Sequence, residues 1–390
     1  MNGLWERWKA CFPAEPEWKV DWDSIAETGQ FIWITTMQQT QQNPVWHGEG
    51  DVWTHTQMVC EELVCMPLFR RLPVRQQQEV FLAALLHDIG KVRCTRMEAG
   101  EWTSPNHAVI GSRMAREWLW KQWGLSGSEE ARIFRETVCW LIRYHAVPPH
   151  ILTQKNPERR LIQIAANGEL AEDFSLELLC LLSAADVLGR ITDRKQESLE
   201  TVELCAETAK DAGCLKKPLF FAEEASEYAY LSGRTAQPEL EWYDDTWGEV
   251  ILLSGLPGTG KDTWIQNNGG EYPVVSLDEI RKQMHISPKE AQGVVISQAK
   301  EQAMQYLRKK QPFIWNGTNL TGRIREKQIR LFEGYHASVR VVFLETGWEE
   351  GLRRNRQRVR EVPEQVIADM LQSLVLPERG EARSVEWYCV

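Results

Sequence analysis

The sequence GLPGTGKDT at residues 255–263 constrains the fold more than any other part of the chain. It follows an apolar run, EVILLSG at 249–255, and leads into residues with a helical pattern. Glycines let the backbone curl so that amide N–H groups face phosphate oxygens, and the following helix adds a favourable dipole at its N-terminus. A strand, a glycine-rich loop and a helix in this order predict a phosphate-binding loop in an α/β sheet.

The composition of this loop predicts a site for ATP and Mg²⁺. Lys261 is expected to reach the β- and γ-phosphates. Asp262 stands where a Ser or Thr normally contacts Mg²⁺, and Thr263 follows one place later, as in loops of the adenylate-kinase type. We expect Thr263 to contact the metal, while Asp262 either assists it or caps the helix. The expected ATP-binding residues of the loop are Gly255, Gly258, Thr259, Gly260, Lys261, Asp262 and Thr263.

The pattern of apolar residues changes along the 390-residue chain and predicts two domains. Residues 1–235 show helical spacing, as in QQEVFLAALLHDIG at 77–90, and predict an all-α bundle. The polar residues 236–247 indicate a linker. Residues 248–390 predict an α/β domain with a parallel sheet. Its apolar runs lie at 249–255, 272–278, 312–319 and 339–346, and helical patterns such as that at 289–310 lie between them.

Charge and cysteine usage narrow the function classes. The net charge is −10, yet residues 248–390 carry 20 Lys and Arg against 18 Asp and Glu. Nucleic-acid contact is therefore expected in the second part of the chain and not on the acidic first part. Nine cysteines form no CxxC pair, which favours reduced thiols in a cytoplasmic protein over a disulfide framework or a zinc ribbon. The longest apolar stretch, near 176–188, is too short to span a bilayer.

Two segments after the loop predict how a phosphate acceptor is handled. VVSLDEIR at 274–281 places Asp278 at the end of a strand, beside the cleft where α/β sheets bind ligands. A carboxylate there can accept the proton of an attacking hydroxyl, and Arg281 on the same helical face can hold a neighbouring phosphate. Further on, Arg354 and Arg358 share a face and predict a lid that neutralises charge on the transferring phosphate. Alternatively, Asp278 is a helix cap and the arginines are solvated surface charges.

The motifs GLPGTGK, SLDEIR and RNRQR…VPEQVI occur in the order found in 5′-hydroxyl polynucleotide kinases of the phage and bacterial RNA-repair type. This resemblance covers residues 248–375. It implies that Asp278 is the general base, that Arg281 grips the acceptor, and that Arg354 and Arg358 hold the phosphates of ATP. WNGTNLT at 315–321 is similar to a motif that borders the same cleft, so Asn319 is expected to contact the acceptor or a phosphate.

Histidine and aspartate residues in the first part predict a metal site. HDIGK at 87–91 follows an apolar helical pattern, so His87 and Asp88 project together from a helix end. His55, His107, His145 and Asp186 also lie in or beside helical, apolar segments. A single histidine in a helix is usually a packed core residue, but four histidines and two aspartates are harder to explain in that way. Imidazole and carboxylate together suit divalent transition metals such as Mn, Fe, Co, Ni or Zn.

The order H…HD…H…H…D resembles that of HD-domain metallophosphohydrolases over residues 45–195. The resemblance implies one or two metal ions that activate a water for attack on phosphorus. It assigns the first metal to His55, His87, Asp88 and Asp186, and the second to His107 and His145, with His150 as a further candidate. Lys91 would bind a phosphate oxygen. His47, in WHGEGD, is either a pocket residue or a surface residue.

The two resemblances together are similar to the bifunctional HD-Pnk enzymes of bacterial RNA repair. They imply ATP-dependent phosphorylation of 5′-OH ends of RNA or DNA, and metal-dependent removal of a 2′ or 2′,3′-cyclic phosphate. A separate RNA ligase would then be the partner that seals the ends. Two alternatives stay open. One is a kinase of a small metabolite or nucleotide fused to an HD nucleotidase, and the other is a nucleotide-binding regulatory protein.

Overall fold

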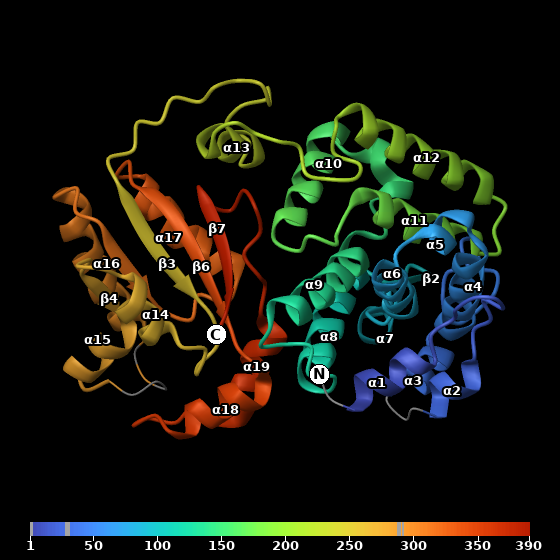
Figure 1. Ribbon diagram of the computed structural model, residues 1–390, viewed down its shortest axis with the longest axis horizontal. Coiled ribbons are helices and arrows are strands. Elements are labelled where there is room, and N and C mark those ends of the chain that lie inside the picture. Colours follow the sequence, from blue (N-terminus) through green and yellow to red (C-terminus); the bar gives the residue numbers. More distant parts are fainter. Residues whose placement is uncertain (1–2, 28–31, 287–289, 291) are drawn as a thin grey trace. The chain divides into compact units, whose positions relative to one another are not determined.

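The computed structural model describes residues 3–27, 32–286, 290 and 292–390, and the chain divides into two compact units. The first unit is mainly helical and comprises Met1–Ser126 and Glu130–Leu219. The second unit contains a parallel sheet and comprises Gly127–Glu129 and Phe220–Val390. Figure 1 shows both units. This architecture confirms the expected fold class. Among the described helices, none combines the length and apolar character that a bilayer-spanning segment needs.

The helical unit also contains a short antiparallel hairpin, so the expectation of a purely α-helical domain was wrong in this detail. Its strands have three residues each and are largely exposed, which leaves little apolar pattern to read. Ala99 and Gly100 turn the chain with positive φ values of 52° and 88°. The elements are α1 Gly3–Ala10, α2 Trp22–Glu27, α3 Ile34–Gln39, α4 Val52–Cys65, α5 Pro67–Arg71, α6 Val74–Leu86, α7 Lys91–Cys94, β1 Arg96–Glu98, β2 Glu101–Thr103, α8 His107–Lys121, α9 Glu129–Tyr144, η1 Pro148–Thr153, α10 Pro157–Ala165, η2 Ala166–Glu169, α11 Leu176–Leu188 and α12 Lys195–Asp211.

Three helices, α4, α6 and α11, pack against one another in the centre of this unit. α11 is apolar almost all round, which is typical of a helix enclosed by others. Its N-terminus is set by Ser175, whose hydroxyl accepts a hydrogen bond from the amide of Leu178. Each buried leucine contributes about 1.5–3 kcal/mol to this packing. The packing holds His55 on α4 close to Asp186 on α11 and to His87 just after α6.

Gly90 brings two further segments of the helical unit together. A Cβ atom at this position would lie 2.0 Å from the carbonyl oxygen of His107 and 2.6 Å from the amide nitrogen of Gly111. No other residue fits against the backbone of α8 at this distance. The glycine therefore allows the turn that carries His87 and Asp88 to lie directly against the start of α8.

The pKa values of two buried glutamates of this unit are shifted in opposite directions. Burial, followed by the nearby Asp173, raises the pKa of Glu79 well above its ordinary value. Burial also raises the pKa of Glu136, but Arg116 and Arg135 outweigh it and the net pKa is lowered. The shortest contacts of Glu136 are 2.7 Å to Nη2 of Arg116 and 2.7 Å to Nε of Arg135. Glu79 thus holds its proton more tightly than an ordinary glutamate, and Glu136 holds its proton less tightly.

We expect Glu79→Gln to stabilise the protein at neutral pH. The folded state keeps the proton of Glu79 above pH 4.5, its ordinary pKa, where the unfolded chain has lost it. The wild type therefore loses up to ~1.4 kcal/mol of stability per pH unit above that value until the folded-state pKa is reached, and the glutamine variant does not. Calorimetric unfolding between pH 4.5 and pH 8.5 measures this divergence. Coinciding pH profiles of the two proteins would contradict it.

Glu136→Gln is the matched control because it changes the same group in the opposite environment. It leaves the buried Arg116 and Arg135 without their carboxylate, which costs about 3–5 kcal/mol. Since the folded-state pKa is lowered, the stabilisation by Glu136 is complete above the unfolded pKa and is lost as the pH falls through the folded one. The penalty of this variant should therefore be largest at neutral pH and shrink in acid.

The second unit is built on five parallel strands in the order β4-β5-β3-β6-β7 (Figure 1). The chain runs from the central β3 to β4 and β5 on one side, and then to β6 and β7 on the other. Such a change of direction opens a crevice at the carboxyl ends of the strands, where ligands bind in α/β sheets. The elements are α13 Glu224–Leu231, β3 Glu249–Ser254, α14 Lys261–Asn268, β4 Val274–Ser276, α15 Leu277–Gln283, α16 Gln292–Arg308, β5 Phe313–Asn316, α17 Gly322–Glu333, β6 Ser338–Glu345, α18 Trp348–Arg356, α19 Glu364–Ser373 and β7 Ser384–Cys389.

The four strands expected from apolar runs are present, with boundaries within a few residues of the predictions. β7 was not expected, because SVEWYC at 384–389 alternates polar and apolar residues, as an edge strand does, and lacks a continuous apolar run. The helix predicted over 289–310 is found as α16, and the start of the predicted range lies outside the described residues. α16 packs on β4 and β5, and α17 packs on β6.

The division between the units falls earlier than the predicted linker. α13, which the sequence places with the helical domain, belongs to the second unit. Its Tyr228 hydroxyl donates to Glu333 Oε1 at 2.5 Å, and Glu227 accepts from Nε of Arg379 at 3.0 Å. Residues 236–247 have no helix or strand, as expected for a linker, but the Trp247 indole donates to the carbonyl of Tyr335 at 2.7 Å. Polar contacts across more than a hundred residues decide this boundary, and no local pattern predicts them.

Candidate functional sites

The six predicted metal ligands of the helical unit lie together and are largely buried. His55 Nε2 lies 3.0 Å from Asp186 Oδ1 and 3.3 Å from His87 Nε2. His107 Nε2 lies 3.4 Å from His145 Nε2. The six come from separate parts of the bundle, with His55 on α4, His87 and Asp88 in the turn after α6, His107 at the start of α8, His145 just after α9 and Asp186 on α11.

The imidazole rings are oriented so that their Nε2 atoms face one another. Nδ1 of His87 and Nδ1 of His145 each lie 2.7 Å from a backbone carbonyl oxygen, and Nδ1 of His107 lies 3.0 Å from another. A carbonyl only accepts, so each Nδ1 carries a hydrogen and Nε2 is the ring atom that can present a lone pair to a cation. Burial, followed by His87, lowers the pKa of His145 to about 3, which keeps this ring neutral. Lone pairs that face each other at these distances fit a bound cation.

Asp88 lies between the two histidine pairs. Its Oδ2 is 3.3 Å from His87 Nε2, and its Oδ1 is 3.5 Å from His107 Nε2. In the part of the chain that the structure describes, no hydrogen-bond donor satisfies the buried Oδ1. Ligand atoms of His55, His87 and Asp88 form one compact group, and those of Asp88, His107 and His145 form another. The residues therefore fit one or two divalent cations that share Asp88.

Neighbouring cations keep both aspartates of the centre ionised. Burial raises the pKa of Asp88, but Lys91 and His87 outweigh it and hold the pKa well below its usual range. Nζ of Lys91 lies 2.6 Å from Asp88 Oδ2. For Asp186, Arg190 likewise outweighs burial and lowers the pKa, with Nη2 2.5 Å from Oδ2. Ionised carboxylates are the form in which aspartate binds a metal.

Glu49 and Arg190 contribute to the centre and were missed by the sequence analysis. Glu49 Oε1 lies 2.9 Å from His55 Nδ1 and 2.8 Å from His47 Nδ1, and its Oε2 accepts from the amide of Ile191 at 2.8 Å. By contacting Nδ1, this carboxylate orients the His55 ring so that Nε2 faces the other ligands. Arg190 follows Asp186 by four residues, just past the end of α11, and this spacing could have indicated it. Glu49 lies in a loop, and no local signal singles it out.

A cavity of about 350 Å³ opens over this centre. Asp88, His107, His145 and Asp186 line it together with Lys91 and Arg190. His47 also lines it and is buried, so the structure favours the pocket interpretation of that residue. His150 lines the cavity from η1, but among the described residues it is not part of a compact ligand group.

In the second unit, the glycine-rich loop follows β3 as predicted. Gly255, Gly258 and Gly260 have φ values of 150°, 83° and 78°, which side chains with a Cβ rarely adopt. Nζ of Lys261 donates to the carbonyl oxygens of Gly255 at 2.9 Å and Leu256 at 2.8 Å. Burial, followed by the nearby Arg358, lowers the pKa of Lys261 to about 8. An anion beside the ammonium group would offset both effects, as expected for a lysine that binds phosphate.

Asp262 and Thr263 lie in the first turn of α14. Gly260 is the N-cap residue of this helix and has no side chain, so the capping role considered for Asp262 was wrong. Oδ1 of Asp262 instead accepts a hydrogen bond from Nδ2 of Asn316, at the end of β5, at 2.8 Å. The side chain of Thr263 is exposed, and its contact with Mg²⁺ stays a prediction.

Asp278 lies at the N-terminal end of α15 and forms ion pairs with two of the predicted arginines. Arg281 pairs with its Oδ1, and Nη2 of Arg358 lies 3.2 Å from its Oδ2. The helix is capped by Ser276, so Asp278 is not the cap residue. Its side chain is 59% exposed. The carboxyl group is thus held between two guanidinium groups and is open to solvent.

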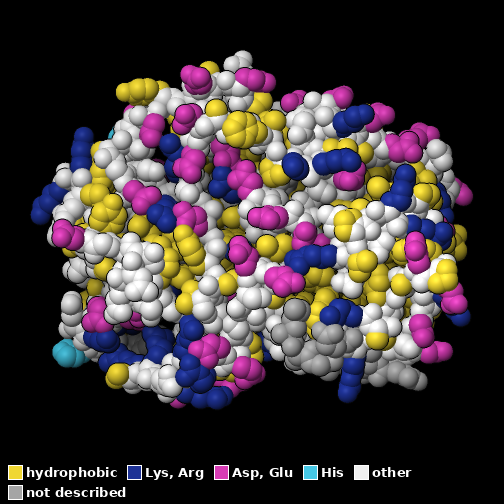
Figure 2. Space-filling view, in the orientation of Figure 1, with side chains coloured by type: hydrophobic (Ala, Val, Ile, Leu, Met, Phe, Trp, Pro, Cys, Tyr) yellow, Lys and Arg dark blue, Asp and Glu magenta, His cyan; other side chains and the backbone are white. Residues whose placement is uncertain are grey.

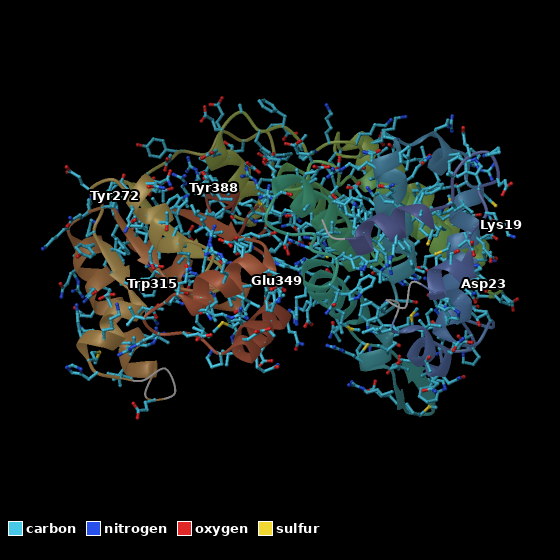
Figure 3. The ribbon with its side chains drawn as sticks, turned by 60° about the horizontal axis from the view of Figure 1, so that its bottom comes forward. Lys19, Asp23, Tyr272, Trp315, Glu349 and Tyr388 are labelled. Carbon is cyan, nitrogen blue, oxygen red and sulfur yellow. The ribbon has the colours of Figure 1, made fainter. Side chains whose placement is uncertain are left out.

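The helix α18 lies against the phosphate-binding loop. A Cβ on Gly258 would be 2.4 Å from the carbonyl oxygen of Gly351, and a Cβ on Gly260 would be 3.5 Å from Nη1 of Arg354. Nε of Arg354 lies 2.6 Å from Glu350 Oε1, which orients the guanidinium. In Figure 2, basic side chains surround a hollow beside α14, α15 and α18. Figure 3 brings this side forward and labels Glu349, in the first turn of α18.

Asn319 is buried, with 3% of its surface exposed. Its Nδ2 donates to the carbonyl of Leu253 at 2.7 Å, and its own carbonyl accepts from Nη1 of Arg325 at 3.0 Å. These bonds hold the loop after β5 against the end of β3. The geometry gives Asn319 a structural role, and the predicted contact with an acceptor receives no support from it.

Two family descriptions match separate parts of the chain. The HD domain family matches residues 52–191, and the AAA domain family matches residues 250–377. The first range spans α4 to α11 and includes all six clustered ligands. The second spans β3 to α19, leaves β7 outside, and includes the phosphate-binding loop, Asp278 and the arginines of α18.

Individual similar proteins match only part of the chain. The human heterogeneous nuclear ribonucleoprotein U-like protein 2 is 27% identical over 149 residues, which is 34% of this chain. The match spans 20% of that relative's length. A gluconokinase from Sinorhizobium meliloti 1021 is 19% identical over 36% of this chain and 82% of its own, with a TM-score of 0.28. A similarity at this level carries no argument about substrate.

The fold and the two sites define a chain in which an HD domain of the phosphohydrolase type is joined to a P-loop domain of the kinase type. Nucleotide binding follows from the P-loop domain, and metal binding follows from the clustered histidines and aspartates.

Proposed function

We propose that this chain heals both ends of broken RNA, phosphorylating a 5′-OH with ATP in the P-loop domain and removing a 2′ or 2′,3′-cyclic phosphate in the HD domain. The observation that carries the proposal is the exposed Asp278 carboxylate between Arg281 and Arg358, next to the phosphate-binding loop. A small metabolite is usually enclosed, and most of its surface is buried in its site. An open carboxylate flanked by two cations suits the end of a polyanion better.

The kinase residues have roles that follow from their positions. Asp278 accepts the proton as the 5′ oxygen attacks the γ-phosphorus, the bond to the β–γ bridging oxygen breaks, and ADP leaves. Lys261, Arg354 and Arg358 neutralise the charge that develops on the phosphoryl oxygens. Arg281 binds the phosphate that follows the terminal nucleoside. Asp262 and Thr263 are the residues that would hold Mg²⁺ with ATP.

The HD residues would hold one or two divalent cations through His55, His87, Asp88, His107, His145 and Asp186. A bound cation of this kind supplies Lewis-acid activation of water and of the phosphate. Lys91, which lines the cavity beside Asp88, would bind a phosphate oxygen of the substrate, while Arg190 keeps Asp186 in place. We propose Mn, Co, Ni, Fe or Zn as the metal from the nitrogen-rich ligand set. The human relative is named a ribonucleoprotein, which agrees with an RNA substrate. The match covers 20% of that protein, so the name adds no weight to the proposal.

A single incubation tests the proposal. The protein is mixed with ATP, Mg²⁺ or Mn²⁺, and a short RNA that bears a 5′-OH and a 2′,3′-cyclic phosphate, and both termini are identified by mass. We expect a 5′-phosphate and a 3′ end that has lost its phosphate, ready for a separate ligase. Phosphate transfer to nucleosides or sugars, with none to the oligonucleotide, would instead support a small-molecule kinase fused to a nucleotidase.

A further inference from the structure

Two tryptophans line the same cavity as the residues of the HD centre. Trp46 comes from the loop before α4, and Trp102 comes from β2 of the exposed hairpin. Both side chains are partly exposed, and both line the same cavity as Asp88 and Lys91. The phosphohydrolase chemistry described above assigns no role to these rings.

The two indoles retain faces on which a ligand can stack. The Arg194 guanidinium lies over one ring, with its Cζ 5.0 Å from the centroid of Trp46. Among the residues that the structure describes, no aromatic ring or guanidinium is paired with Trp102. A partly exposed aromatic ring that lines a cavity can serve as a stacking platform, because every nucleobase has a π-face.

The amide side chains that line the cavity are already engaged. Gln42 Oε1 accepts from Lys91 at 2.6 Å, and its Nε2 donates to the carbonyl of Asp51 at 3.2 Å. Asn43 Oδ1 accepts from the amide of Val45 at 3.0 Å, and its Nδ2 donates to Glu101 at 3.4 Å. These amides are therefore poor readers of base edges. Stacking on the indoles, unlike hydrogen bonding to base edges, tolerates any base.

The volume of the cavity limits how much of a substrate enters. At about 350 Å³, it lies near the lower end of small-molecule sites, which occupy ~300–1,000 Å³. A cavity of this size suits one terminal nucleotide and excludes a longer stretch of folded strand.

We propose that Trp46 and Trp102 form a stacking subsite for the base of the terminal nucleotide whose phosphate lies at the HD centre. The HD domain then prefers phosphate esters that carry a nucleobase, whichever base it is, over phosphate esters without one. This inference rests on the proposed phosphohydrolase function and adds the substrate class that this function accepts.

The test compares metal-loaded full-length wild type with Trp46→Ala and Trp102→Ala on two matched substrates, a nucleoside 2′-monophosphate and base-free ribose 2-phosphate. We expect each substitution to raise KM for the nucleotide about 5- to 150-fold, which corresponds to ~1–3 kcal/mol per stacked base. The value of kcat should change less than about two-fold, since stacking acts on binding. The base-free substrate should be turned over equally by all three proteins. Trp102→Phe keeps a flat ring and should recover most of the nucleotide affinity.

Trp22→Ala is the control, because Trp22 belongs to the same unit and does not line the cavity. Its KM for the nucleotide should equal that of the wild type. Equal loss on both substrates in the Trp46 and Trp102 variants, or no preference of the wild type for the nucleotide, would overturn the subsite. If the wild type leaves RNA ends untouched but hydrolyses the mononucleotide with this tryptophan dependence, the end-healing function fails and the subsite stands.

Discussion

Replacing Asp278 by asparagine is expected to slow phosphate transfer to a 5′-OH oligonucleotide by about 10²–10⁴-fold. The amide keeps the shape of the side chain and can still contact Arg281 and Arg358, but it cannot accept the proton of the attacking hydroxyl. The KM for ATP should stay close to that of the wild type, because Asp278 lies outside the glycine-rich loop and the amide can still contact both Arg281 and Arg358. Single-turnover transfer of labelled phosphate measures the effect.

Glu279→Gln is the matched control for this variant. Glu279 is the next residue on α15, is similarly exposed and forms its ion pair with Lys282. It should transfer phosphate at the wild-type rate. Equal losses in the two variants would show that the charge of the helix matters and not the proton acceptor. Hydrolysis by the HD domain should be unchanged in both, and its loss in a folded Asp278→Asn protein would contradict two separable sites.

Replacing Asp88 by asparagine is expected to remove the metal from the helical unit and to abolish phosphohydrolase activity. Asp88 is the one carboxylate common to both compact ligand groups among the described residues, and its oxygens lie 3.3–3.9 Å from Nε2 atoms of four histidines. An amide offers a weaker, neutral ligand, so we expect a loss of metal affinity of ~100-fold or more. Metal content per chain after dialysis measures this directly. Phosphorylation of 5′-OH ends should continue at the wild-type rate.

His150→Ala is the comparison for this second variant. His150 lines the cavity but stands apart from the compact ligand groups that the structure describes, so its loss should leave the metal content unchanged. Retention of metal in Asp88→Asn, or its loss in His150→Ala, would contradict the ligand set. An unfolding transition of the helical unit close to that of the wild type shows that each variant is folded, and this control is needed because Asp88→Asn also removes the charge that pairs with the buried Lys91.

Several features of the sites could be predicted because they depend on local geometry. The glycine-rich loop is a continuous motif between a strand and a helix, so its place at the end of β3 follows from the order of residues alone. His87 and Asp88 are adjacent, and the helix before them has a clear apolar pattern. Arg190 could have been predicted from its four-residue spacing to Asp186 but was not.

The amino-acid sequence by itself determined the class of each unit and the phosphate-binding loop, because these reside in short patterns of spacing and residue type. The six candidate metal ligands span residues 55–186 and were predicted from the order of histidines and aspartates and from a family resemblance. Only the tertiary structure decided which distant groups meet. The ion pair of Asp278 with Arg358 spans 80 residues, the contact of Glu49 with His55 depends on a loop, and the cavity lined by Trp46 and Trp102 depends on how a hairpin packs. The physical reason is that hydrogen bonds and helical periodicity act between near neighbours, whereas burial of apolar surface acts across the whole chain and sets the remaining distances.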